Sequence, residues 1–221
     1  MHGIDGDIAE LGHGAGLTVT LVVAVLLGLR HATDPDHLTA VSTLALAGDR
    51  RGSRAAAELG LAWGLGHAAT LLALGLPAVF VEAELPTSIR TAAETAVGGL
   101  LIVLALRLLL RWRRGYLHLD TRPGHLWRTP LTACGVGMLH GIAGSAGVGV
   151  LLVGAVYTGT TAATALAVFA LAAALSMALV SAAFGCALSH DAVRSRLRML
   201  VPLFVSAGLA VGVWYAASAA T

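Results

Sequence analysis

The chain has 221 residues, of which 57% are apolar and only 12% are charged. Its mean hydropathy is +0.82, whereas soluble domains carry about a quarter charged residues. So few polar side chains could not coat a soluble bundle, and the composition therefore predicts an all-α polytopic membrane protein. The formal net charge of +2 gives no reason to expect a nucleic-acid partner.

Charge-poor stretches recur along the whole chain, and most of them reach the roughly 20 residues that a membrane-spanning helix needs. We therefore predict six transmembrane helices, the third extending over 89–111. A segment at 1–15 precedes a three-helix half at 16–112, a loop at 113–129 and a second half at 130–221. The six stretches are 16–30, 55–80, 96–110, 131–157, 162–188 and 199–219.

All 14 basic residues are arginines, and most of them gather in every second connection between the predicted helices. They follow the first helix at 50–54, surround the loop at 113–129 and fill the connection at 194–198, whereas the alternate connections are uncharged or acidic with a single arginine, Arg90. By the positive-inside rule, the basic connections face the cytoplasm and both termini face outward. We expect a multi-pass protein of the plasma (inner) membrane.

The first apolar unit, 16–48, is too long for one straight spanning helix. Its residues would cover about 50 Å, against a hydrocarbon core of about 30 Å. Pro35 disfavours the helical conformation at Asp34, which then suits the N-cap of a new half-helix. We predict that the helix is broken at 31–37, as in transporters that bind ions on interrupted helices.

A partial repeat links the two halves of the chain. Gly28 and His31 recur as Gly137 and His140, with the same spacing and an offset close to half the chain. Two three-helix halves joined in this way must have opposite orientations, which predicts a 3+3 inverted repeat with a site between the halves. A chance match of two residues is the alternative.

Residues 31–37 concentrate two imidazoles and two carboxylates in the middle of an apolar segment. Each aspartate at a bilayer centre costs about 2.5–3.5 kcal/mol, so these groups need partners there. Nitrogen and oxygen ligands of this kind suit divalent transition-metal ions. In the alternative, Arg30 forms an ion pair with Asp34 or Asp36 that serves folding alone. The candidate metal ligands are His31, Asp34, Asp36, His37, His67 and His140.

Three motifs resemble those of the nickel/cobalt transporter family. The sequence RHATDPDHL at 30–38 resembles the family's RHAxDADHI signature, and LGHAAT at 65–70 resembles LGHSTVV. LHGIAGSA at 139–146 is similar to a stretch of the short, six-helix branch related to urease-accessory nickel permeases. The resemblance implies transport of Ni²⁺ or Co²⁺ as substrate, with the histidines and aspartates of 31–37 recognising the ion.

The chain departs from the family pattern at Pro35, where alanine is more usual. The related exporters often carry a long histidine-rich loop, and its absence here favours uptake. Met1 and His2 are a further candidate metal site, because an α-amine, an amide and an imidazole suit square-planar Ni(II).

Other functions remain open from the sequence. A metal exporter of the same fold would carry the same motifs, and a metal sensor or accessory subunit would bind the ion without moving it. An enzyme is not expected, because the sequence contains neither HExxH nor a P-loop, and no resident cofactor is expected.

Overall fold

The computed structural model describes residues 17–34, 37–38, 53–81, 87–114, 129–142, 159–190, 196, 199 and 201–218. These residues form six helices and no strand, which confirms the predicted all-helical fold class. The helices are α2 (Leu17–His31), α4 (Ser53–Val81), α5 (Thr87–Arg113), α6 (Pro130–Ile142), α8 (Gly159–Ser189) and α10 (Val201–Ser218). Each overlaps one of the six predicted apolar stretches. The fourth stretch is described only as far as residue 142.

The start of α6 shows how local sequence sets a helix boundary. The ring of Pro130 occupies the first helical position, where a backbone N–H is not needed. Thr129 is the N-cap, because its Oγ1 accepts a hydrogen bond from the Thr132 N–H at 3.2 Å. The Thr132 hydroxyl returns to the cap by donating to the Thr129 carbonyl at 2.9 Å. This cap sets the first residue of α6, the helix that carries His140.

Helix α2 ends at His31, and helical structure resumes at His37 and Leu38. The Thr33 N–H donates to the Arg30 carbonyl at 2.8 Å, which closes the last turn of α2. The Asp34 carbonyl then accepts the Leu38 N–H at 2.9 Å, the bond expected from an N-cap residue. The described ends of this segment therefore agree with the predicted helix break, while Pro35 and Asp36 lie outside the described residues.

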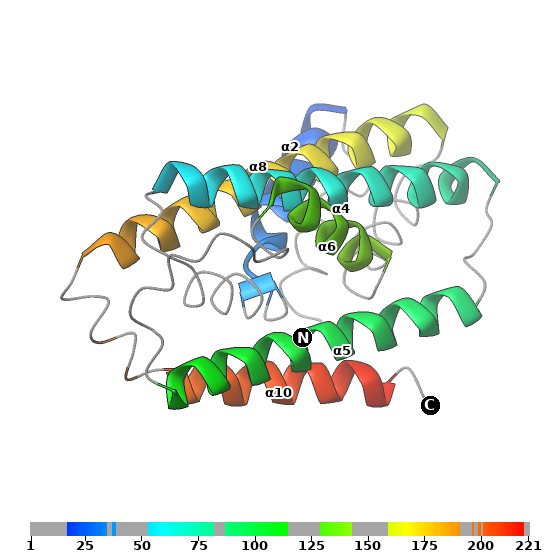
Figure 1. Ribbon diagram of the computed structural model, residues 1–221. Helices are drawn as coiled ribbons and strands as arrows, with labels where there is room; N and C mark the ends of the chain where they lie inside the picture. The colour runs from blue at the N-terminus through cyan, green and yellow to red at the C-terminus, as the bar shows by residue number, and fades with distance from the viewer. Residues whose placement is uncertain are drawn as a thin grey trace.

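The helices form two groups in Figure 1. Helices α2, α4, α6 and α8 pack together, whereas α5 and α10 lie side by side below them. Within the first group α4 contacts both α6 and α8, and α2 contacts α8. A buried cluster that includes Trp63 of α4, Leu101 of α5 and Tyr215 of α10 joins the two groups.

Close glycine contacts set these helix pairs. A Cβ added to Gly28 of α2 would lie 2.7 Å from the Cβ of Ala172 in α8. A Cβ added to Gly137 of α6 would lie 2.7 Å from Cδ1 of Trp63 in α4. Such distances leave no room for a side chain, so the backbones touch as in tightly packed membrane helices.

The two close contacts are related by the sequence repeat. Gly137 lies 109 residues after Gly28, and Ala172 lies 109 residues after Trp63. The same 109 residues separate His31 from His140. When the two halves are exchanged, the Gly28–Ala172 contact therefore becomes the Gly137–Trp63 contact. In the same way, the pairing of α2 with α8 becomes the pairing of α6 with α4.

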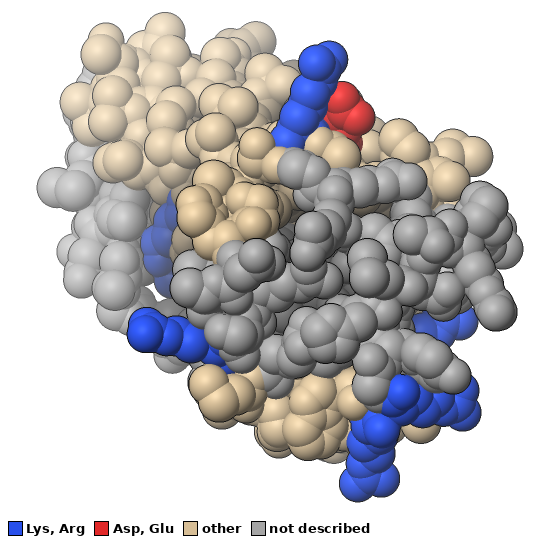
Figure 2. Space-filling view, turned by 60° about the vertical axis from the view of Figure 1, so that its left-hand side comes forward, with Lys and Arg blue, Asp and Glu red and all other residues tan. Residues whose placement is uncertain are grey.

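Two described helices, over Ser53–Pro77 and Gly159–Ala187, are long and apolar enough to cross a membrane. Helices α2, α6 and α10 contain shorter apolar segments. On the face shown in Figure 2, the described side chains are mainly neutral and only a few carry charge. These features agree with the membrane protein that the composition predicts.

Candidate metal site

Three histidines, from α2, from α4 and from the helical turn that follows α2, meet in the interior. His31 is the last residue of α2, His37 lies in the helical turn, and His67 lies in the middle of α4. One nitrogen from each of the three lies within 4.8 Å of the other two. His37 and His67 are 0% exposed and His31 is 5% exposed. We call these three residues the histidine cluster.

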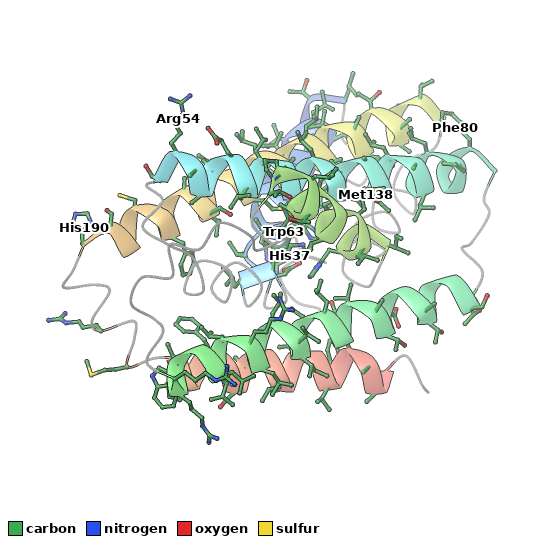
Figure 3. The ribbon with its side chains drawn as sticks, viewed as in Figure 1. His37, Arg54, Trp63, Phe80, Met138 and His190 are labelled. Atoms are coloured by element: carbon green, nitrogen blue, oxygen red, sulfur yellow. The ribbon has the colours of Figure 1, made fainter. Side chains whose placement is uncertain are left out.

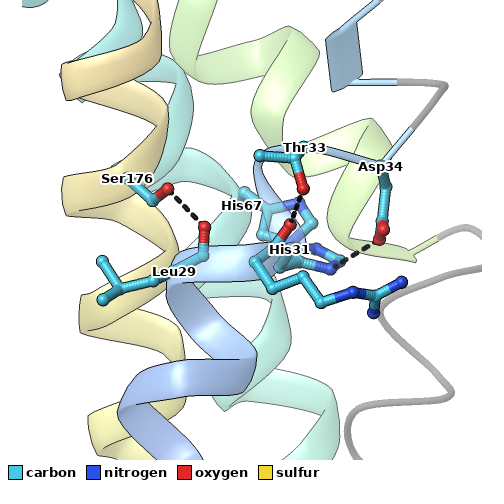
Figure 4. A network of polar contacts seen from close by, with 7 residues as sticks. Leu29, His31, Thr33, Asp34, His67 and Ser176 are labelled. Atoms are coloured by element: carbon cyan, nitrogen blue, oxygen red, sulfur yellow. Dashed lines mark hydrogen bonds and ion pairs between the residues drawn. The ribbon is translucent and has the colours of Figure 1, made fainter. Parts of the chain in front are cut away.

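The nitrogens of the cluster have a defined orientation. Nε2 of His31 lies 2.9 Å from Nε2 of His67, within hydrogen-bonding distance. Nδ1 of His31 lies 3.1 Å from Oδ2 of Asp34 (Figure 4). Two nitrogens bound at 90° to one ion, each at about 2.05 Å, would also be about 2.9 Å apart. The separation of the two Nε2 atoms is therefore that of two ligands of one ion.

Aromatic side chains form the walls of the cluster. The ring of Phe169 in α8 lies 5.5 Å from the His31 ring, measured between centroids. Trp63 in α4 stacks on His37 at 5.5 Å with an interplanar angle of 23°. Figure 3 shows His37 and Trp63 in the interior, whereas Arg54 and His190 lie near the outer ends of α4 and α8. These rings limit the orientations that the imidazoles can adopt.

His140 of α6 extends the group of imidazoles toward the second half of the chain. Its side chain is 1% exposed, and its ring centroid lies 5.2 Å from that of His37. Trp63 packs edge-on against the same ring at 5.6 Å. His140 is therefore adjacent to the cluster, beside His37 and Trp63, but it is not one of the three residues whose nitrogens lie within 4.8 Å.

Of the other predicted site residues, the structure describes Asp34 and Arg30. Asp34 lies beside the cluster, with its carboxylate on His31. Arg30 contributes its carbonyl oxygen, which accepts hydrogen bonds from N and Oγ1 of Thr33. Asp36, Met1 and His2 lie outside the described residues.

Sequence reasoning missed three residues that shape the site. Trp63 precedes His67 by one helical turn and so shares its helix face. This spacing in the sequence could have placed Trp63 beside the site. Ser176 of α8 donates a hydrogen bond to the Leu29 carbonyl at 2.6 Å and thereby holds the last turn of α2 (Figure 4). Ser176 occupies the position in the second half that corresponds to His67 in the first, so the repeat also pointed to it. Phe169 had no such signal.

The described part of the chain is all-helical, with a buried cluster of imidazoles between its helices. The chain is similar to the urease accessory protein UreH of Bacillus sp. (strain TB-90), with 29% identity over 135 residues. That match covers 57% of this chain and 58% of the relative's length. It agrees with the resemblance of the motifs to the branch related to urease-accessory permeases. No family model and no solved structure matches the chain.

Proposed function

We propose that this chain is a multi-pass permease that carries Ni²⁺ or Co²⁺ across the plasma membrane. The observation that carries the proposal is the histidine cluster, in which three buried imidazoles from separate helical segments converge within 4.8 Å. Imidazole is a ligand that nickel and cobalt accept readily. The similarity to a urease accessory protein supports the same conclusion, because the motifs already resemble those of related nickel permeases.

In this proposal His31, His37 and His67 supply nitrogens to the ion. His140 provides a fourth imidazole from the second half, and Asp34 and Asp36 supply negative charge. Two walls of the site are buried, since Trp63 is 3% exposed and Phe169 is 2% exposed. In such surroundings a divalent ion is held only if imidazoles and carboxylates replace its hydration shell.

The helix pairing supports the proposed 3+3 inverted repeat. In Figure 1, α4 and α8 have opposite directions, as do α5 and α10. Each of these pairs joins equivalent helices of the two halves, and antiparallel packing of equivalent helices is what an inverted repeat requires. Gly98 of α5 packs against Ala216 of α10 while Gly212 packs against Ile102, as expected for an antiparallel pair. These two contacts correspond at a separation of 114 residues, not at the 109 that relates His31 to His140, so they support the antiparallel pairing alone. On this basis we propose six membrane spans, with the ion site between the two halves.

The proposed direction is uptake. Moving a divalent ion inward down a potential of about 100 mV releases about 4.6 kcal/mol, twice the value for one charge. That energy supports about three decades of accumulation without ATP. The arginine-rich connections at 113–129 and 194–198 place the cytoplasm on their side in this proposal, with both termini outside.

Transport of radioactive nickel into proteoliposomes tests the proposal, with cobalt and zinc run in parallel. We expect flux with the wild-type protein, and loss of both flux and nickel binding in His67→Ala. His190→Ala is the matched control, because His190 is exposed at the end of α8 and should leave both unchanged. Nickel binding without flux in either direction would instead favour a sensor or accessory protein. Wild-type protein that binds no nickel or cobalt would refute the proposal.

A further inference from the structure

The carboxylate of Asp34 contacts one nitrogen of His31 while the other nitrogen faces the histidine cluster. Oδ2 of Asp34 lies 3.1 Å from Nδ1 of His31, and Nε2 of the same ring lies 2.9 Å from His67 (Figure 4). An ionised carboxylate only accepts, so Nδ1 donates to it, and in the neutral ring Nε2 then presents its lone pair. In the ion-free protein His67 is then the donor in the contact between the two rings, and its Nε2 must lose that proton before it binds an ion. The Asp34 contact thus selects the tautomer of His31 that can bind an ion through Nε2.

The backbone of Asp34 is held at both of its polar groups. Its N–H donates to the His31 carbonyl at 3.1 Å, and its carbonyl accepts from the Leu38 N–H at 2.9 Å. The first bond ties Asp34 to the end of α2, and the second ties it to the turn that carries His37. The backbone of Asp34 is therefore held relative to two members of the cluster, and its side chain is 17% exposed.

We propose that Asp34 acts on the substrate ion through His31, as a positioning residue, and does not bind the ion itself. This inference rests on the proposed function and revises the role that the sequence suggested for Asp34. Histidines that bind metals commonly donate their second N–H to a carboxylate, which fixes the ring and raises its basicity. Asp34 has the contact with Nδ1 of His31 and the backbone hydrogen bonds that this role requires.

The test uses the purified full-length protein in detergent, with Co²⁺ as the spectroscopic probe. Asp34→Asn keeps the side-chain volume but removes the charge and no longer obliges Nδ1 to be the donor. We expect it to weaken cobalt binding by about 10–100-fold, the usual loss when such a partner is changed. At saturating cobalt its visible absorption bands should match those of the wild type, because the ligands are the same. Glu58→Gln is the control, since Glu58 is an exposed acid paired with Arg54.

A His31→Ala background separates the two roles of Asp34 further. If Asp34 acts only through His31, Asp34→Asn should cause no additional loss of affinity in that background. Altered cobalt bands in Asp34→Asn, or the same fold-loss with His31 already absent, would overturn the inference. If His31→Ala abolishes cobalt binding, the cobalt absorption bands of Asp34→Asn alone decide between the two roles of Asp34. A wild-type protein without cobalt binding would defeat the proposed function, which is a separate outcome.

Discussion

Replacing Gly28 by alanine should damage the metal site without touching any ligand. A Cβ at this position would lie 2.7 Å from the Cβ of Ala172 and 3.0 Å from the backbone nitrogen of Ala173. Carbon atoms in good contact are about 3.5–4.0 Å apart, so α2 must move away from α8 by about 1 Å. His31 lies one turn further along the same helix and must move with it.

The expected magnitudes separate stability from binding. Alanine in place of glycine favours a helix by about 1 kcal/mol, while overpacking costs about 1–3 kcal/mol. The net loss of stability is therefore about 0–2 kcal/mol, and the protein should still fold. Metal–ligand distances tolerate only about 0.2 Å, so a shift of about 1 Å between His31 and His67 removes one nitrogen from the site. We expect nickel affinity to fall by at least about 10-fold, by analogy with other losses of ligand orientation.

Isothermal titration of nickel into purified protein, together with thermal unfolding, measures both effects. Gly135→Ala is the matched control, because among the described residues nothing lies within 4 Å of a Cβ added there. It should leave nickel affinity at the wild-type value. Unchanged affinity in Gly28→Ala, or equal losses in the two variants, would refute the argument that the α2–α8 contact positions His31.

Two more predictions concern the same site. Ser176→Ala removes the hydrogen bond to the Leu29 carbonyl. It should lower the free energy of unfolding by about 0.5–1.5 kcal/mol and also lower nickel affinity. Unaltered affinity would show that this contact does not hold the end of α2. Nickel binding should weaken as the pH is lowered, because protons compete with the ion for the imidazole nitrogens. Nickel titrations over a series of pH values measure this effect, and an affinity that is independent of pH would contradict a site of three imidazoles.

The sequence by itself determined the helices and most of the candidate ligands. Apolar stretches predicted all six described helices because the lack of charge extends over whole helix lengths and needs no knowledge of neighbours. The break after His31 was predictable from Pro35, since proline restricts the residue before it. The motif resemblance selected His31, His37 and His67, which do come together in the interior.

Only the tertiary structure decided what each of these groups contacts. A sequence does not orient a carboxylate, so Asp34 could be assigned to the ion, to Arg30 or to His31, and the structure places it on Nδ1 of His31. Phe169 belongs to the second half of the chain, yet its ring lies 5.5 Å from that of His31 because α8 packs along α2. Packing of this kind depends on which helix faces meet, and close approaches at glycines such as Gly28 set those faces. Helix formation follows from local composition, whereas the chemistry of the site follows from contacts between residues that are distant in sequence.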